Sequence, residues 1–474
     1  MNTPVLRLYV LVIVLFAILV GFTSRWTVFD ADSLRDNELN RRALLQEQKI
    51  RRGAIRTQDG EALARSVPRP GDTWGRRYPT ADLFTHAVGY SFTTIGRAGI
   101  ERSRNDELTG QTDELTGVLD SLLGKDDRGD AVVTTLRTRA QEEAVAALEE
   151  SGHKGALVAL DTRTGGVLAM ASVPSYDPNT INDPRRFAEL NRDTENAPLV
   201  NRATQNGYPP GSTMKVVTAA AALDTGRYRP DSRVNGENGK PISGVPLNNF
   251  GSEDFGDVDL TFALTNSINT VWAEVGEKLG GRTMQRYMER FGFYAEPPLD
   301  YPDAQMSASG VRKRGQLVPV TNDSVDVGRV AIGQGDLFAT PLQMASVAQT
   351  IANGGVRLKP HFMGRVVDPD GRTVEEAEPE EAQRVVSRET AAQLTDMMRQ
   401  VVREGTGTAA ALEGVEVAGK TGTAELNLQG LNQPWFMGFA GDVAVAVTLE
   451  RFQGGTGGTV AAPIARRVLQ ALGQ

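Results

Sequence analysis

Cysteine is absent from all 474 residues of the chain. Its absence excludes disulfide bonds, a cysteine nucleophile and thiolate ligands for a metal ion. Histidine is nearly absent as well, and no two of the three histidines have the i, i+4 spacing that pairs metal ligands on a helix. We therefore expect neither a metal site nor a cofactor.

Lysine is also scarce, because only nine of the 51 Lys and Arg residues are lysine. A lysine within a motif is therefore harder to explain by chance than an arginine. The formal net charge is −8, which argues against nucleic-acid binding by the chain as a whole. What remains is an ordinary globular composition, with 40% hydrophobic and 23% charged residues, in a chain long enough for two or three domains.

One long apolar run lies near the start of the chain. Residues 8–24 are 17 uncharged residues, which would span about 25 Å as a helix. A cleaved signal peptide is the alternative, but no Ala-x-Ala site follows the run. Arg7 gives a positive charge before it. We expect residues 1–25 to be a short cytoplasmic N-terminus and a single-pass anchor in the cell membrane, with the rest of the chain on the extracytoplasmic side.

The residue composition and the periodic patterns of the remaining sequence change near residue 150. Residues 26–150 are polar and rich in arginine, with a strand–turn–strand pattern at 51–66 and a helical pattern at 137–152. We expect them to form a small mixed α/β module. Residues 151–474 are expected to form a second, larger domain.

The larger domain begins and ends with strand patterns. Residues 155–174 have the alternation of a hairpin around a Thr-Gly-Gly turn, and residues 415–426 and 435–450 have late strand patterns. Helical patterns lie between them at 213–224, 270–280, 339–353 and 388–403. This order predicts an α+β fold in which strands from both ends form one sheet, with helices packed on it. The acidic run at 375–383 is interpreted as a solvated linker.

A candidate nucleophile lies where a turn becomes an apolar helix, in the stretch YPPGSTMKVVTAAAAL at 208–223. Ser212 and Lys215 are three residues apart, so on a helix both side chains share one face. A serine hydroxyl needs a base, and a lysine whose pKa is lowered by burial or by a second cation can act as one. The unpaired N–H groups of the first turn could stabilise an oxyanion.

Two later motifs supply partners, and each motif also has a decoy. The partners are Ser267-Ile-Asn269, before a helical pattern, and Lys420-Thr421-Gly422-Thr423, in a strand pattern. The decoys, Ser151-Gly-His-Lys154 and Ser103-Arg-Asn105, lie in a polar turn and a charged stretch and are interpreted as structural. Any single motif is weak, but all three in this order are a strong signal for an activated serine nucleophile.

These motifs resemble those of the penicillin-binding proteins and serine β-lactamases. Segments 51–64 (RRGAIRTQDGEALA) and 98–110 (AGIERSRNDELTG) add a resemblance to class B penicillin-binding proteins, in particular to the actinobacterial penicillin-binding protein A group. The resemblance implies a transpeptidase domain with an antiparallel sheet and helices on both sides. It also implies that the preceding module is a non-catalytic one of the pedestal or dimerisation type.

The resemblance further implies the roles of the catalytic residues. Ser212 attacks the carbonyl of the penultimate D-Ala in a peptidoglycan stem peptide that ends in D-Ala-D-Ala, with Lys215 as base. Ser267 and Lys420 pass a proton to the leaving D-Ala, and Asn269 holds the base and the substrate amide. An amine of a neighbouring stem peptide completes the cross-link. β-Lactam antibiotics acylate the same serine and remain there.

The resemblance places substrate binding on the Lys-Thr-Gly-Thr motif. Thr421, Gly422 and Thr423, helped by Lys420, bind the terminal carboxylate. The backbone N–H groups of Ser212 and Thr423 form the oxyanion hole. No residue of the motif is a metal ligand.

Two alternative functions remain at this point. A β-lactamase or carboxypeptidase would share the nucleophile, but the only look-alike of a deacylating glutamate motif, 296–300, lacks the expected asparagine. An idle sensor would usually have more membrane spans. The 26–150 module is either a spacer or, in our hypothesis, the docking element for a membrane glycan polymerase of the shape, elongation, division and sporulation family.

Overall fold

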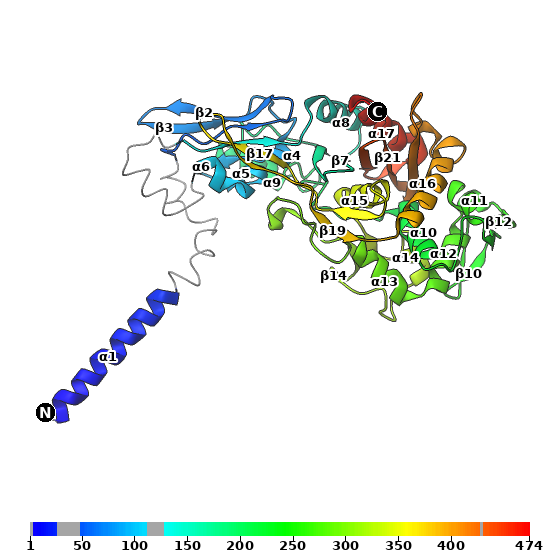
Figure 1. Cartoon of the computed structure of the whole chain (residues 1–474), viewed down its shortest axis with the longest axis horizontal. Helices are drawn as coiled ribbons and strands as arrows, with labels where there is room; N and C mark the ends of the chain where they lie inside the picture. Colours follow the sequence, from blue (N-terminus) through cyan, green and yellow to red (C-terminus); the bar gives the residue numbers. More distant parts are fainter. Residues whose placement is uncertain (1–2, 26–47, 111–127, 427–429) are drawn as a thin grey trace.

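The computed structural model describes residues 3–25, 48–110, 128–426 and 430–474. Within these ranges a single helix is long and apolar enough to cross a membrane: α1, Thr3–Ser24, the dark blue helix of Figure 1. None of its residues is buried. The helix includes the whole apolar run of the sequence, so it fits an anchor by length and by composition.

One of two six-stranded sheets is antiparallel and joins strands from both ends of the predicted larger domain. Its order is β20-β21-β22-β7-β8, with the short β23 beside β21. The strands are β7 (Gly155–Asp161), β8 (Val167–Val173), β20 (Val417–Glu425), β21 (Leu431–Ala440), β22 (Val443–Leu449) and β23 (Phe452–Gln453). β7 and β8 form the predicted hairpin, and β22 joins it to the late strands. The predicted α+β fold is confirmed.

Helices cover both faces of this sheet, because its strands bury side chains on both faces. In β7, Ala156, Val158 and Leu160 belong to one hydrophobic cluster, and Leu157 and Ala159 belong to another. Successive side chains of a strand point to opposite faces, so each cluster needs its own helical layer. The first cluster includes α10 (Lys215–Asp224) and α15 (Pro341–Ala352), and the second includes α8 (Thr138–Glu150) and α17 (Ala462–Ala471).

The four predicted helices of the larger domain are all present. They are α10, α12 (Asn269–Leu279), α15 and α16 (Arg388–Arg403). Two have side-chain caps of the expected kind: Thr340 accepts from the backbone N–H of Gln343 before α15, and Ser387 accepts from Thr390 before α16. Pro341 at the first helical position favours the start of α15 as well.

The second six-stranded sheet has the order β18-β17-β6-β1-β2-β3. Its strands are β1 (Ile55–Arg56), β2 (Ala62–Arg69), β3 (Thr73–Arg77), β6 (Ala131–Thr134), β17 (Met363–Val367) and β18 (Thr373–Glu376). β1 and β2 confirm the predicted strand–turn–strand pattern. β17 and β18 come from the far side of the predicted boundary at residue 150, and Figure 1 shows them in yellow beside the blue strands. The boundary itself stays a prediction.

The acidic run at 375–383 is not a linker, and that interpretation is wrong. It lies across the end of β18 and most of β19 (Glu381–Arg384), which pairs with β16 (Val356–Leu358). Every side chain of β18 is exposed, so the run is solvated as expected. The strands form nevertheless, because cross-strand backbone hydrogen bonds do not require apolar side chains.

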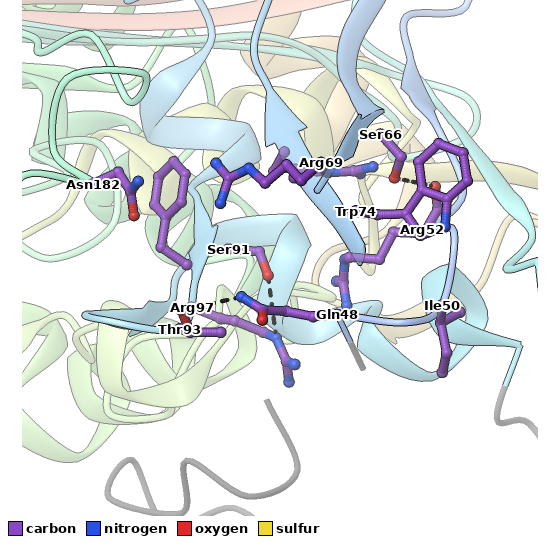
Figure 2. Close-up of a pocket in the computed structure, with 13 residues that line it drawn as sticks. Gln48, Ile50, Arg52, Ser66, Arg69, Trp74, Ser91, Thr93, Arg97 and Asn182 are labelled. Atoms are coloured by element: carbon purple, nitrogen blue, oxygen red, sulfur yellow. Dashed lines mark hydrogen bonds between the residues drawn. The ribbon is translucent and has the colours of Figure 1, made fainter. Parts of the chain in front are cut away.

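A buried group of charges lies in the middle of the N-terminal module. The carboxylate of Glu101 accepts from Nη2 of Arg52 at 3.0 Å and from Nε of Arg76 at 2.5 Å, and Tyr78 donates to it at 3.2 Å. Burial alone would raise the pKa of Glu101, but the two guanidinium groups outweigh it and the pKa is lowered. Figure 2 shows the adjoining cleft, where the Ser66 hydroxyl donates to the backbone carbonyl of Arg52.

Two segments that resemble catalytic motifs by sequence, Ser103-Arg-Asn105 and 296–300, connect the N-terminal module to the larger domain. Arg104, in the Ser103-Arg-Asn105 decoy, forms an ion pair with Asp300 at 2.7 Å. The Asp300 carboxylate also accepts from the backbone N–H groups of Phe362 and Met363, which lead into β17. The decoy and the 296–300 segment are therefore structural, as interpreted from the sequence.

Candidate active site

Ser212 lies in a 3₁₀ turn, Gly211–Met214, that leads directly into α10. The sequence predicted the first turn of an α-helix here, and the 3₁₀ geometry brings residues i and i+3 more nearly into line. Gly211 has φ of 53°, and a Cβ atom there would come within 3.1 Å of the backbone of Thr423 and Ala424. A glycine is therefore needed where β20 passes the nucleophile. Among the described residues, the Ser212 hydroxyl has no hydrogen-bond partner.

Lys215 is fully buried at the start of α10 and is held by neutral groups. Its Nζ donates to the backbone carbonyl of Ser267 at 2.6 Å, to Asn269 Oδ1 at 2.7 Å and to Ser267 Oγ at 3.2 Å. The Ser-x-x-Lys and Ser-x-Asn motifs are thus brought together across more than 50 residues of chain.

Ser267 connects the two lysines of the site. Lys420 Nζ, which is also buried, donates to Ser267 Oγ at 2.8 Å. Ser267 follows α11 (Leu260–Thr265) and has φ of 57°, in the left-handed region. A non-glycine residue costs about 1–2 kcal/mol there. The backbone holds this strained conformation, which aims the hydroxyl between the two amines.

The pKa values of both lysines are shifted downward. Burial, and then the nearby Lys420, lower the pKa of Lys215 well below its ordinary value. Burial lowers the pKa of Lys420 to about 7. Among the described residues no carboxylate forms an ion pair with either amine, so only neutral hydrogen-bond acceptors, and no opposite charge, compensate for the lost hydration. A neutral amine at Lys215 can act as a general base near neutral pH.

The Lys-Thr-Gly-Thr segment lies in β20, which is an edge strand of its sheet. Thr421 Oγ1 lies 2.6 Å from Thr406 Oγ1, and Thr423 Oγ1 accepts from the backbone N–H of Gly457 at 3.1 Å. Gly422 lies beneath them, where a Cβ atom would come within 2.7 Å of the carbonyl oxygen of Pro210. Gly422 thus allows close packing of β20 on the turn before Ser212.

These residues surround one cavity of about 160 Å³. The predicted site residues that line it are Ser212, Ser267, Asn269, Thr421 and Thr423, while Lys215, Lys420 and Gly422 lie behind its wall. Residues that the sequence analysis did not select also line it: Phe250, Asn266, Ile332, Gln334, Thr406, Glu425, Thr456 and Gly458.

Of the missed residues, only Glu425 had a usable signal, because it is two residues beyond Thr423 in a strand pattern and so points to the same face. Gln334 belongs to the Gly-rich loop that supports the turn, since Gly333 accepts from the N–H of Gly211 at 3.0 Å. Nothing in the local sequence distinguishes Thr406 or Thr456. Among the described residues, no group of three or more His, Asp or Glu side chains could hold a metal ion.

Residues 155–470 match the family described as "Penicillin binding protein transpeptidase domain". The chain belongs to this family. Residues 52–132 also match "Penicillin binding protein A dimerisation domain". The chain is 36% identical to peptidoglycan D,D-transpeptidase PbpA of Mycolicibacterium smegmatis and 35% identical to PbpA of Mycobacterium tuberculosis, over 99% of each chain in both cases. The resemblance to class B penicillin-binding proteins is confirmed.

Solved structures of this family agree with the fold. Penicillin-binding protein A from M. tuberculosis, as a ceftriaxone acyl-enzyme complex, matches 91% of this chain and all of that chain with a TM-score of 0.82 and 32% identity. The penicillin G acyl-enzyme complex of the same protein matches 90% of this chain with a TM-score of 0.79. Covalent β-lactam binding therefore occurs in penicillin-binding proteins of this fold.

Proposed function

We propose that Ser212 is the nucleophile of this chain, which is a serine-type, penicillin-sensitive peptidoglycan D,D-transpeptidase. The observation that carries the proposal is a single hydroxyl, Ser267 Oγ, hydrogen-bonded to both Lys215 and Lys420 in the wall of the cavity that Ser212 lines. Neutral Lys215 takes the proton of Ser212 as the serine oxygen attacks the carbonyl of the penultimate D-Ala.

The negative oxygen of the tetrahedral intermediate is stabilised by the backbone N–H groups of Ser212 and Thr423. When the intermediate collapses, the C–N bond to the terminal D-Ala breaks. The leaving nitrogen takes a proton through the Ser267 hydroxyl, which Lys215 and Lys420 flank. Thr421 and Thr423 bind the terminal carboxylate of the substrate, and Lys420 provides a nearby positive charge when it is protonated.

The acyl group then passes to an amine. The nitrogen of a neighbouring stem peptide attacks the ester and gives up a proton to the lysine pair. The new C–N bond forms, the C–O bond to Ser212 breaks, and the serine oxygen takes its proton back from the lysine pair. Asn269 Oδ1 accepts from Lys215 at 2.7 Å and so keeps that amine in place in both half-reactions. A β-lactam acylates Ser212 in the same way, but its leaving group stays attached to the adduct.

The test is intact-mass analysis of the full chain in detergent after incubation with penicillin G. We expect a single adduct that lasts for hours. The matched variants are Ser212→Ala, which should form no adduct, and Ser151→Ala, which alters the serine of the decoy motif and should behave as the wild type.

Two outcomes would contradict the proposal. An adduct that persists in Ser212→Ala would place the nucleophile elsewhere. An adduct that clears within seconds would indicate a β-lactamase, because hydrolysis would then outrun the slow deacylation expected of a transpeptidase.

We further propose that α1 anchors the chain as a single membrane span with the catalytic domain on the extracytoplasmic side, where peptidoglycan is assembled. The support is the length and apolar composition of α1. A lone transpeptidase needs glycan strands made nearby, so the N-terminal module is proposed to dock a membrane glycan polymerase of the shape, elongation, division and sporulation family.

Co-purification from membranes tests the docking proposal. The full chain and Ser212→Ala should both retain the polymerase, and a chain without residues 26–120 should lose it. Penicillin acylation of the shortened chain is the control for its folding. Retention of the polymerase by a shortened chain that still binds penicillin would contradict the proposal.

A further inference from the structure

Glu425 is the last residue of β20, is exposed, and lines the catalytic cavity. Side chains two apart in a strand share a face, so Thr421, Thr423 and Glu425 form one row along the cavity wall. Glu425 is the one ionisable residue among the described residues that line this cavity. Its side chain is exposed and forms no ion pair or hydrogen bond with any described residue. The cavity thus has a carboxylate available for a ligand.

The order of groups along β20 gives a direction to the bound peptide. The terminal carboxylate lies at Thr421 and Thr423 in the proposed function, and the reacting carbonyl lies at Ser212 and the N–H of Thr423. The bound peptide, followed from its terminal carboxylate to its reacting carbonyl, therefore runs along β20 toward Glu425, the last residue of the strand. An extended peptide can pair with an edge strand, at about 3.4 Å for each residue. The residue before the two D-alanines then lies within reach of Glu425.

The charges of the cavity match a peptide with opposite charges at its two ends. Buried Lys420 lies behind Thr421 and attracts a carboxylate, and Glu425, at the other end of the row, attracts a cation. Cross-linking joins an acyl donor to an amine, and a stem peptide with a diamino acid carries such an amine on a side chain. At neutral pH that amine is an ammonium group.

We propose that Glu425 binds the side-chain ammonium group of the stem peptide's diamino acid. The proposal rests on the proposed function, because the direction of the peptide follows from Ser212 as nucleophile. The ammonium group can belong to the donor peptide, where it fixes the third residue before acylation. It can also belong to the acceptor peptide, where it is the amine that attacks the acyl-enzyme.

The donor arm measures D-Ala release by the full chain in detergent. The probes are two synthetic peptides that end in L-Lys-D-Ala-D-Ala, one with a free lysine side chain and one with that side chain acetylated. The wild type should prefer the free amine by about two- to fivefold in kcat/KM, the range typical of one exposed ion pair. Glu425→Gln should remove the preference and Glu425→Lys should reverse it. Glu413→Gln, which changes an exposed glutamate outside the cavity, should keep it.

The acceptor arm starts from acyl-enzyme formed with the acetylated donor. The measured quantity is the ratio of transfer, to a peptide with a free lysine side chain, over hydrolysis. If Glu425→Gln lowers this ratio but leaves donor selectivity unchanged, the ammonium group that Glu425 binds is that of the acceptor. If the variant leaves both quantities at wild-type values, the proposal is wrong.

Penicillin G acylation separates this proposal from the proposed function. Penicillin G has no ammonium group, so its acylation of the wild type tests the Ser212 chemistry without involving the amine-binding role of Glu425. Normal acylation of the wild type, together with a Glu425→Gln variant that keeps both the donor selectivity and the transfer ratio at wild-type values, would overturn the role of Glu425 alone. Failure of wild-type acylation would overturn Ser212 chemistry, and the role of Glu425 would fall with it.

Discussion

Two buried groups of basic side chains differ in what neutralises them. In the N-terminal module, Arg52 and Arg76 share the carboxylate of Glu101. In the catalytic domain, Lys215 and Lys420 share only neutral acceptors, chiefly the Ser267 hydroxyl. The first arrangement keeps its charges and connects segments 49 residues apart in the chain. The second favours loss of protons.

The difference shows how burial can have opposite consequences for basic residues. A buried cation with an anionic partner becomes a structural cross-connection, and arginine suits this role because it cannot give up its proton. A buried amine without an anion has its pKa lowered and becomes a base. The partner, and not the depth of burial, decides between structure and chemistry here.

The largest expected effect is on catalysis. Lys215→Ala removes the base from the second group, and we expect acylation by penicillin G to slow by about 10³–10⁴-fold, the upper range for general-base catalysis. The rate of adduct formation measures it. Lys154→Ala, in the decoy motif, should acylate at the wild-type rate. A Lys215→Ala rate within tenfold of the wild type would show that another group takes the proton.

The next largest effect is on stability. Glu101→Gln leaves two buried guanidinium groups without an anion and should lower the free energy of unfolding by about 3–5 kcal/mol. Denaturant unfolding of the full chain in detergent measures the change. Glu143→Gln, which removes one carboxylate from a half-exposed ion pair with Arg467, is the control and should change it much less. Equal effects of the two variants would mean that burial is not what makes the Glu101 group strong.

A third prediction concerns the stability of the catalytic group. The pKa of Lys420 is about 7 in the folded chain and 10.5 ordinarily, so between these values the unfolded chain binds more protons. Stability should therefore rise with pH across this window, by at most about 1.4 kcal/mol for each unit. Lys420→Met should flatten the rise. Equal slopes for the wild type and the variant, from denaturant unfolding at pH 7 to 10, would contradict the lowered pKa.

The smallest expected effect is a shift in a pH profile. Acylation needs neutral Lys215, so its rate should fall on acidification, but only well below pH 10.5 because the pKa of Lys215 is lowered. Lys420→Met removes a nearby positive charge, so the pKa of Lys215 should rise and the acid limb should move to higher pH. Penicillin G acylation rates across pH, scaled to each variant's maximum, give the limb. A limb that stays in place would show that burial alone sets the pKa of Lys215.

Much of the catalytic domain could be predicted from local patterns. The hairpin of β7 and β8 and the four helices have strong two-residue or 3.6-residue periods. The assembly of Ser212, Ser267 and Lys420 could be predicted as well, because three weak motifs in a known order support one another. The spacing alone could not separate the two Ser-x-x-Lys motifs, but their local context favoured Ser212, and the structure adds that Lys215 is fully buried whereas Lys154 is not.

Features that depend on distant contacts could not be predicted. The pairing of Arg52 with Glu101 has no local signal, since both residues lie in charged segments with many possible partners. The pairing of β17 with β6 in the N-terminal sheet could not be predicted either, because the two strands are far apart in the sequence and no local pattern links them. The acidic run at 375–383 was wrongly interpreted as a linker. Its composition correctly indicated that the acidic side chains are exposed, but composition does not indicate whether the backbone pairs in β18 and β19.

The strand order of the N-terminal sheet determines when during synthesis this sheet can be completed. β6 is complete at Thr134, but its partner β17 begins only at Met363. At synthesis rates of about 5–20 residues per second, roughly 10–50 s separate the two strands on the ribosome. During that interval Val132 and Val133 lie in an unpaired edge strand, which other chains could join. The edge of β6 is therefore protected from aggregation only after the ribosome has synthesised β17, in the last quarter of the chain.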